Sequence, residues 1–341
     1  MISRRRIAFA SIAIMIGALG AGGALVAADL YLHHRAERSA GLNRWGYRGP
    51  VVPRKATGEI RVAMLGGSTV FGYGTLWHEA APAALEQQLR QTHPRQPIHV
   101  VNLGYNNDGA HAAMPTLEDY RYLEYDVVIL YEGYNDLAGD DGPNLQVYRR
   151  QSPVFRLTGY SPLLPLWLEE KAWSLRGRQP GGKTVFKPDL ASRTSAAAFE
   201  TASSVGEMLG RQLDGLSTPA PAAAANGSDC ARPWSQFCDA IVRATVFARS
   251  LGASVLIVTP PLSPVPNMRA RSVSQQASLS QAIAKRFATD RGVAYQDLSS
   301  AIDLSDTTYS FDTMHLGPQG NWRLATLMLP VVEQLAWPSR S

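Results

Sequence analysis

The sequence predicts an α/β fold of three layers, with helices on both faces of a five-stranded parallel sheet. Two features of the chain lead to this prediction. Short runs rich in β-branched residues are each bounded by turn-forming or polar residues, and segments with helical spacing of apolar residues separate them. Strands that alternate with helices form parallel sheets, and right-handed crossovers then give a doubly wound, flavodoxin-like domain.

The individual elements follow from the same patterns. The predicted strands are residues 60–65, 98–102, 126–131, 253–259 and 293–297. The predicted helices lie near residues 79–92, 112–123, 235–251, 273–290 and 318–336. Of the 341 residues, 45% are hydrophobic and 18% are charged, so the chain can bury a core of ordinary α/β size.

An N-terminal segment stands outside this pattern. Residues 7–28 carry no charge, follow Arg4, Arg5 and Arg6, and precede Asp29. At a rise of about 1.5 Å per residue, such a segment crosses a hydrocarbon core of about 30 Å. Positive charge on its N-terminal side keeps that end in the cytoplasm. We therefore expect a single-pass protein of the cytoplasmic membrane, with its body facing the periplasm or the cell exterior.

A cleaved signal peptide is the competing interpretation, because the small residues at 26–28 suit a signal peptidase. We favour an uncleaved anchor, since the apolar stretch is longer than the usual signal core of about 7 to 15 residues. The expected organisation is an anchor at residues 1–29, a juxtamembrane lead-in at 30–58 and an α/β domain at 59–338. Within that domain, the long insertion at 141–233 is interpreted as a lid or subdomain, or as packing that covers the sheet.

The charge balance gives no indication of nucleic-acid binding. The formal net charge is +5, and the three arginines before the apolar segment leave only +2 for the remainder. Downstream of them, no run rich in Lys and Arg is interleaved with aromatic residues. We expect no nucleic-acid partner.

The two cysteines, Cys230 and Cys238, lie close together in a loop-like stretch. In an exported body a local disulfide between them is plausible. Two unrelated buried thiols are the alternative, because sequence alone does not show whether the side chains meet.

Four short blocks place glycines and polar residues where predicted strands end. Residues 66–69 (Gly-Gly-Ser-Thr) follow the first strand, 102–104 (Asn-Leu-Gly) the second and 133–136 (Gly-Tyr-Asn-Asp) the third. The fourth block, 312–315 (Asp-Thr-Met-His), comes after the last strand and before the final helix. Ligand sites of open α/β sheets lie at the carboxyl edge, so we expect the blocks to meet there.

With these blocks the sequence resembles the SGNH hydrolases, also called GDSL-like lipases and esterases. That family is named for a Ser, Gly, Asn and His in four separate blocks, and all four occur here in order. The usual Gly-Asp-Ser of the first block is Gly66-Gly67-Ser68 in this chain, a substitution common in a branch of membrane-anchored bacterial members. The resemblance covers roughly residues 44–140 and 253–336, and it implies the SGNH hydrolase fold.

The resemblance also implies a role for each motif residue. Ser68 would be the nucleophile, and His315 the base that takes its proton. Asp312 would hold the imidazole in the productive tautomer. The oxyanion hole would combine the backbone N–H groups of Ser68 and Gly104 with the side-chain amide of Asn135.

Motifs for cofactors and metals fail at identifiable positions. A P-loop needs Lys after its second glycine, but Tyr73 follows Gly72. The third glycine of a dinucleotide loop is replaced by Trp77, and the second histidine of a zinc protease motif by Pro82. We therefore expect no cofactor and no metal.

These observations predict an exported serine esterase that removes an acyl group, most readily acetyl, from a cell-envelope glycan or a related ester. An acyltransferase with the same acyl-serine intermediate is an alternative that the sequence does not separate from the esterase. A catalytically silent envelope-binding module is a second alternative, against which the intact Ser68, Asn135, Asp312 and His315 argue.

Overall fold

The computed structural model describes most of the chain. The described residues are 4–106, 108–137, 150, 152–165, 168, 230, 233–264, 273–290 and 292–338.

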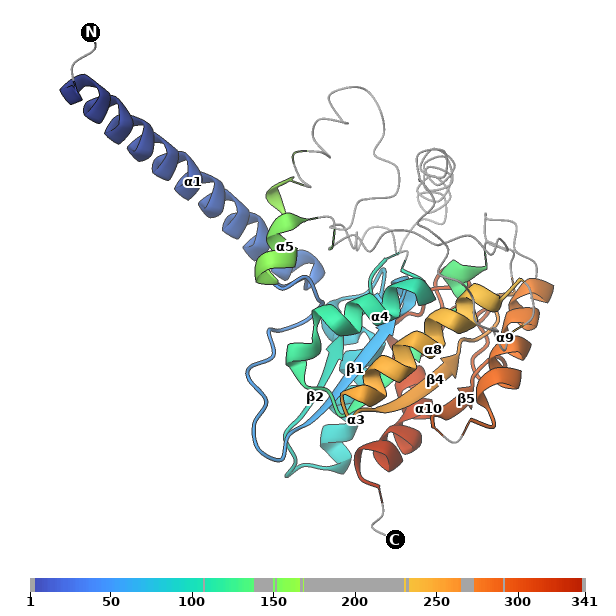
Figure 1. Cartoon of the computed structure of the whole chain (residues 1–341). Helices are drawn as coiled ribbons and strands as arrows, with labels where there is room; N and C mark the ends of the chain where they lie inside the picture. Colours follow the sequence, from blue (N-terminus) through green and yellow to red (C-terminus); the bar gives the residue numbers. More distant parts are fainter. Residues whose placement is uncertain are drawn as a thin grey trace.

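A parallel sheet forms the centre of the domain (Figure 1). Its strands are β1 (Ile60–Gly66), β2 (Ile98–Asn102), β3 (Val127–Tyr131), β4 (Ser254–Thr259) and β5 (Ala294–Asp297). The strand order is β2-β1-β3-β4-β5 and every neighbouring pair is parallel. This is the flavodoxin-like order, so the predicted doubly wound fold is confirmed.

Helices cover both faces of this sheet. Helices α4 (Ala110–Asp119), α8 (Ser235–Ser250) and α9 (Val273–Phe287) share one apolar core with the sheet, and α4 packs directly beside α8 (Figure 1). Helices α3 (Ala81–Thr92) and α10 (Pro318–Ala336) pack together on the opposite face. Successive side chains of a strand point to opposite faces of the sheet, so alternate strand residues pack into the two cores.

The sequence places these elements to within a few residues, and the differences are local. The helix expected over 112–123 is divided into α4 and the 3₁₀ turn η2 (Arg121–Leu123). Glu124 follows η2 in a left-handed conformation (φ 52°), which turns the chain into β3. The helix expected from 79 begins at Ala81, after the 3₁₀ turn η1 (Trp77–Glu79).

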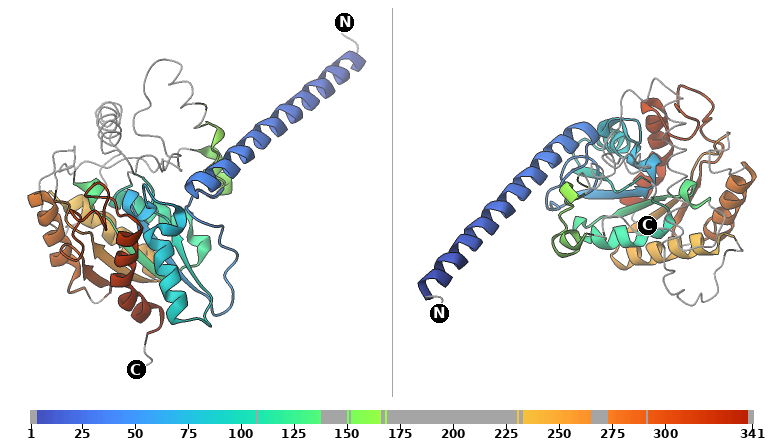
Figure 2. Two further views of the ribbon diagram at one scale, coloured as in Figure 1. Left: turned by 180° about the vertical axis from the view of Figure 1, so that it is seen from behind. Right: turned by 90° about the horizontal axis from the view of Figure 1, so that it is seen from above.

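Helix α1 (Arg4–Ala40) projects from the domain as a single rod (Figure 2). Its segment Phe9–Arg38 is long and apolar enough to cross a membrane, and the most apolar window of 18 residues within it is not buried by the rest of the chain. Signal sequences near an N-terminus share these properties. The helix continues past the predicted boundary at residue 29 and ends where Gly41 adopts a left-handed conformation (φ 70°). The division into anchor, lead-in and domain remains a prediction.

Little of the predicted insertion lies within the described residues. Those include α5 (Pro153–Thr158). Trp167 and residues 194–226, whose sequence carries a helical pattern and an Ala/Pro-rich segment, lie outside the described residues. Where the insertion rejoins the domain, Cys230 and Cys238 form a disulfide with a Cα–Cα distance of 6.1 Å. The predicted local bridge is therefore confirmed.

Candidate active site

Ser68 begins helix α2 (Ser68–Phe71), directly after β1. The register pairs Gly66 of β1 with Tyr131 of β3, so the carboxyl ends of these two strands lie side by side. The chain order of the sheet reverses between β1 and β3, and such a switch point is where ligands of doubly wound domains bind.

The glycine before Ser68 allows a close approach. A Cβ at Gly67 would lie 2.3 Å from Nδ2 of Asn135 and 2.9 Å from the carbonyl oxygen of Asp108. Only a residue without a side chain lets the amide of Asn135 pack against the backbone beside Ser68. Gly67 therefore sets the spacing between the serine and the amide.

Three of the predicted residues form a continuous hydrogen-bonded chain. Oγ of Ser68 lies 2.8 Å from Nε2 of His315, and Nδ1 of the same ring lies 2.6 Å from Oδ2 of Asp312. The side chains of Asp312 and His315 are only 7% and 5% exposed. With its proton on Nδ1, the imidazole donates to Asp312 and presents the Nε2 lone pair to the Ser68 hydroxyl.

The carboxylate of Asp312 is held in its ionised form. Burial disfavours the charge, but the attraction of His315 and hydrogen bonds from that ring and from two backbone N–H groups outweigh it, so the pKa of Asp312 lies below its usual value. Oδ1 accepts from the N–H of Met314 at 3.1 Å and from that of His315 at 2.6 Å. Thr313 lies within this turn at a φ of 65°, a conformation uncommon for a β-branched residue.

Two aromatic residues that sequence reasoning missed flank the imidazole. The Tyr73 ring centroid lies 4.9 Å from that of His315, and the Phe311 ring stacks on it at 6.0 Å. Gly74, at a φ of 76°, permits this packing, because a Cβ there would lie 2.5 Å from the Phe311 ring. The available indication in the sequence was the Gly72-Tyr73-Gly74 run, in which an aromatic residue lies between two glycines.

Asn135 lies in the 3₁₀ turn η3 (Tyr134–Asp136), after β3, and lines the same cavity as Ser68. Its Nδ2 donates to the carbonyl oxygen of Asp108 at 2.7 Å. A side-chain amide has two N–H donors, so one bond fixes the group while the second proton remains to be donated. This geometry is compatible with the predicted donor role.

Gly104 occupies a different position. Its N–H donates to Oδ1 of Asn102 at 3.0 Å, and the residue is not among those lining the Ser68 cavity. A Cβ at Gly104 would lie 2.6 Å from the backbone nitrogen of Phe71, so this glycine is required for packing against α2. Its role as an oxyanion donor remains a prediction, and it requires exchange of the bond to Asn102.

The cavity also contains an acidic residue that sequence reasoning missed. Glu132, between β3 and the third block, lines it together with Ser68 and Asn135 and is only 5% exposed. Burial and the nearby Asp136 and Asp108 raise the pKa of Glu132 well above its usual value. These surroundings therefore favour the protonated form of the carboxyl, which can donate a hydrogen bond. A charged residue directly after a buried strand was the indication available in the sequence.

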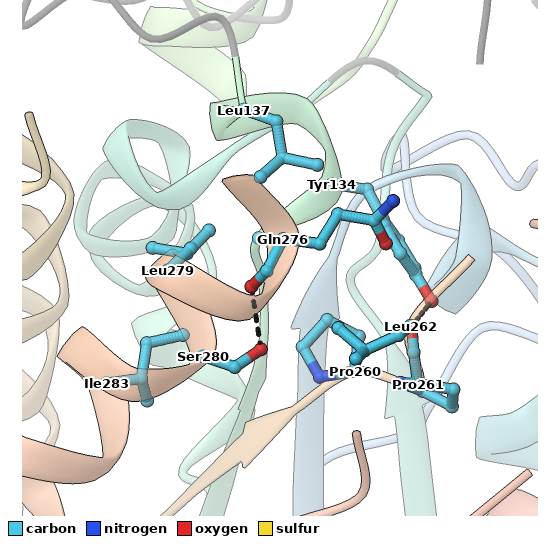
Figure 3. Close-up of a pocket in the computed structure, with 10 residues that line it drawn as sticks. Tyr134, Leu137, Pro260, Pro261, Leu262, Gln276, Leu279, Ser280 and Ile283 are labelled. Atoms are coloured by element: carbon cyan, nitrogen blue, oxygen red, sulfur yellow. Dashed lines mark hydrogen bonds between the residues drawn. The ribbon is translucent and has the colours of Figure 1, made fainter. Parts of the chain in front are cut away.

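A second hollow lies next to this cavity and shares Gly133 and Tyr134 with it (Figure 3). Apolar side chains such as Leu279 and Ile283 form much of its wall, and Gln276 is fixed by two hydrogen bonds to the backbone of Ser263. The hollow could therefore hold part of a ligand, but its lining residues do not include the nucleophile or the base. Among the residues that the structure describes, no cluster of three or more His, Cys, Asp or Glu side chains is arranged to hold a metal ion.

Comparison with known sequences identifies the family. A sequence profile of the GDSL-like lipase/acylhydrolase family matches residues 64–323, a range that includes the serine, both oxyanion candidates and the Asp–His pair. The chain belongs to this family. The predicted enzyme class, a serine hydrolase that acts on ester bonds, is thereby confirmed.

Solved structures of acylhydrolases show a general likeness to this one. A lipase/acylhydrolase from Enterococcus faecalis is 14% identical, with 83% of this chain and 100% of that chain covered and a TM-score of 0.45. TesA is 15% identical over 81% of this chain and 99% of that chain, with a TM-score of 0.42. A variant of Axe2, an acetyl xylan esterase from Geobacillus stearothermophilus, is 14% identical, with 83% of this chain and 97% of that chain covered and a TM-score of 0.40. No curated protein matches the chain.

Proposed function

We propose that this acylhydrolase is an exported, membrane-anchored esterase that removes a short acyl group, acetyl in the first instance, from a glycan of the cell envelope. The observation that carries the proposal is the hydrogen-bonded chain from Asp312 through His315 to Ser68. That chain is what a serine needs to become a nucleophile at neutral pH.

The reaction has two steps. Nε2 of His315 takes the Ser68 proton as Oγ attacks the ester carbonyl, and the protonated ring then gives that proton to the departing alcohol oxygen. Water, deprotonated by the same nitrogen, then attacks the acyl carbonyl. The bond between the acyl carbon and Oγ breaks, the ring returns the proton to Oγ, and the carboxylic acid leaves. Asp312 stabilises the imidazolium in both steps. The amide of Asn135 would donate to the oxyanion, a contribution of about 10²- to 10³-fold in rate.

The dimensions of the cavity support a short acyl group. Thr69, Tyr131 and Glu132 line it beside Ser68, and each is at most 6% exposed. A long acyl chain would have to displace these packed residues. In its protonated form, which burial favours, the carboxyl of Glu132 would donate to an oxygen of the bound ester.

Two features support the proposed location. The exposed apolar helix α1 fits a membrane anchor, and the Cys230–Cys238 disulfide fits a body outside the reducing cytoplasm. The cleaved signal peptide remains the competing form of this proposal.

The test combines labelling with product analysis. Full-length protein is treated with a fluorophosphonate probe, and release of acetate from acetylated envelope glycans is measured for wild type and Ser68→Ala. We expect labelling at Ser68 and acetate release that the substitution abolishes. Labelling elsewhere, or acetate release that survives Ser68→Ala, would contradict the assignment. Acetyl transfer to a glycan acceptor that is faster than acetate release would identify an acyltransferase instead.

A further inference from the structure

The N-terminal part of helix α1 exposes large apolar side chains. Phe9, Ile14 and Leu19 are 73%, 72% and 69% exposed. Lipid tails are the natural environment for such a helix. The uncharged residues 7–28 span about 33 Å at about 1.5 Å per residue, close to the hydrocarbon thickness of about 30 Å, so the membrane boundary falls near Asp29.

At this boundary α1 is fixed to the body rather than hinged. Asp29 is 6% exposed, and its Oδ1 accepts hydrogen bonds from the backbone N–H of Leu163 at 2.8 Å and of Leu164 at 2.6 Å. Its Oδ2 accepts from the hydroxyl of Tyr160. Tyr160 is therefore bound to α1. A buried carboxylate needs such partners, so this contact has a single preferred geometry.

The next turn of the helix adds a second attachment. Nε2 of His33 lies 2.8 Å from the carbonyl oxygen of Ser161, and its ring packs on Tyr160 with centroids 5.1 Å apart. Asp29 and His33 are four residues apart and therefore lie on one face of the helix. We call Asp29, His33 and residues 160–164 the juxtamembrane clamp.

Beyond the clamp, α1 contacts the element that carries the nucleophile. Ala36, Leu42, Leu163 and Phe71 form one buried apolar cluster. Phe71 is the last residue of α2, which begins with Ser68. In the turn after α1, the guanidinium of Arg48 donates to the carbonyls of Phe71, Gly72 and Thr75. The anchor helix and the loop that carries the nucleophile are thus parts of one packed unit.

The direction of α1 brings the catalytic edge to the membrane side. The helix leaves the domain at the edge where the strands end, whereas the C-terminus lies at the opposite end (Figures 1 and 2). From Asp29 to Gly41 the helix rises about 18 Å at about 1.5 Å per residue. If residues 7–28 span the bilayer, the carboxyl edge of the sheet, after which Ser68 lies, is therefore on the side of the domain that faces it.

We propose that the docked helix α1 holds the Ser68 edge toward the membrane, and that the ester substrate is carried on a lipid anchored in that same membrane. This inference rests on the proposed function and narrows its substrate to a lipid-linked glycan ester. A substrate confined to the membrane surface meets a fixed, correctly oriented site at high effective concentration, whereas a freely rotating body would present the site only part of the time.

The test compares one ester in two settings. Full-length protein is reconstituted in phosphatidylcholine vesicles and supplied with an aryl acetate, either free in solution or coupled by a short spacer to a phospholipid headgroup. A variant carries a 20-residue Gly/Ser insertion between Ala28 and Asp29, which leaves every packed residue of the clamp in place but frees the body to rotate. We expect the insertion to lower kcat/KM on the lipid-coupled ester at least fivefold and to change that on the free ester less than twofold.

A point substitution tests the same idea without an insertion. Asp29→Ala removes the hydrogen-bond acceptor of the clamp. Like the insertion, it should lower kcat/KM on the lipid-coupled ester more than on the free ester. His34→Ala is the control, an exposed residue on the same helix and outside the clamp that should leave the preference unchanged. Equal effects of the insertion on both esters would overturn this inference alone. Absence of turnover on both esters, together with an unlabelled Ser68, would instead overturn the proposed function.

Discussion

At the scale of single residues, the site combines groups that each need a defined environment. His315 is held by Asp312 on one side and by the rings of Tyr73 and Phe311 on the others. The pKa of the buried Asp312 lies below its usual value, whereas the pKa of Glu132, which is also buried, lies well above it. Surroundings that move the pKa values of two carboxyl groups apart are a common arrangement in hydrolytic sites.

The first prediction concerns the unity of the Ser68–His315 pair. Ser68→Ala and His315→Ala should each lower kcat by about 10³-fold or more, and the double variant should be little worse, because the two side chains perform one step. Steady-state kinetics on an aryl acetate measures this, with thermal unfolding as a check that each variant folds. Losses that multiply in the double variant would rule out a joint role.

The second prediction concerns Glu132 and stability. Its folded pKa lies above that of an unfolded glutamate, so the stability associated with the protonated form is fully present below the unfolded pKa and is lost as the pH rises toward the folded pKa. While the folded group stays protonated, the loss is about 1.4 kcal/mol per pH unit. Glutamine has nearly the shape of a protonated glutamate but does not ionise, so Glu132→Gln should not lose stability in this way as the pH rises.

Unfolding measured from pH 4 to pH 8 provides the check. Wild type and Glu132→Gln should be similar in stability near pH 4, and the variant should be the more stable at pH 8. Glu124→Gln, at an exposed glutamate, is the control and should show no such difference. A Glu132→Gln curve that stays parallel to wild type across this range would mean that Glu132 ionises normally.

At the scale of elements, the sequence was informative wherever local pattern decides structure. The predicted bounds of the five strands agree with the structure to within one residue at either end, because short β-branched runs between turn residues seldom form anything but strands. The motif residues were found because three of the blocks directly follow strands. The juxtamembrane clamp was not found, since it joins Asp29 to residues more than 130 positions away and no local pattern encodes that pairing. Glu132 and Phe311 were missed for the same reason, because burial depends on tertiary packing.

The third prediction tests the turn between α2 and η1. Gly74 and Gly252 both have left-handed backbones, at φ values of 76° and 85°, but a Cβ at Gly74 would meet Phe311 whereas one at Gly252 would meet nothing within 4 Å. An alanine at either position should cost roughly 1–2 kcal/mol of stability through its backbone. Only Gly74→Ala should also displace Phe311 from His315 and lower kcat by about tenfold, a loss comparable to about 1.4 kcal/mol of transition-state stabilisation. Equal kcat values for the two variants would show that this packing does not affect the base.

At the scale of the whole molecule, the described chain has two kinds of surface. Helix α1 exposes its apolar side chains outside the domain, while the domain buries its own apolar residues on both faces of the sheet. The clamp joins these parts where the polar character of the sequence begins, at Asp29. The Cys230–Cys238 disulfide fits the proposed location of the body outside the cytoplasm, because disulfides persist in oxidising compartments.

The last prediction uses that disulfide to report the orientation of the protein in cells. Arg4, Arg5 and Arg6 favour retention of the N-terminus in the cytoplasm, so in wild-type cells both thiols should resist alkylation until a reductant is added. Replacing the three arginines with glutamate leaves the excess of positive charge on the other side of the apolar segment, at Arg35, Arg38 and Arg44, and should retain the body inside. Its thiols should then alkylate without reductant. Loss of the bridge, which closes a loop between cysteines eight positions apart, should also cost about 2–3 kcal/mol of stability. Thiols that are free in wild-type cells would place the body in the cytoplasm, and a soluble form that begins at Asp29 would show that residues 1–28 are a cleaved signal.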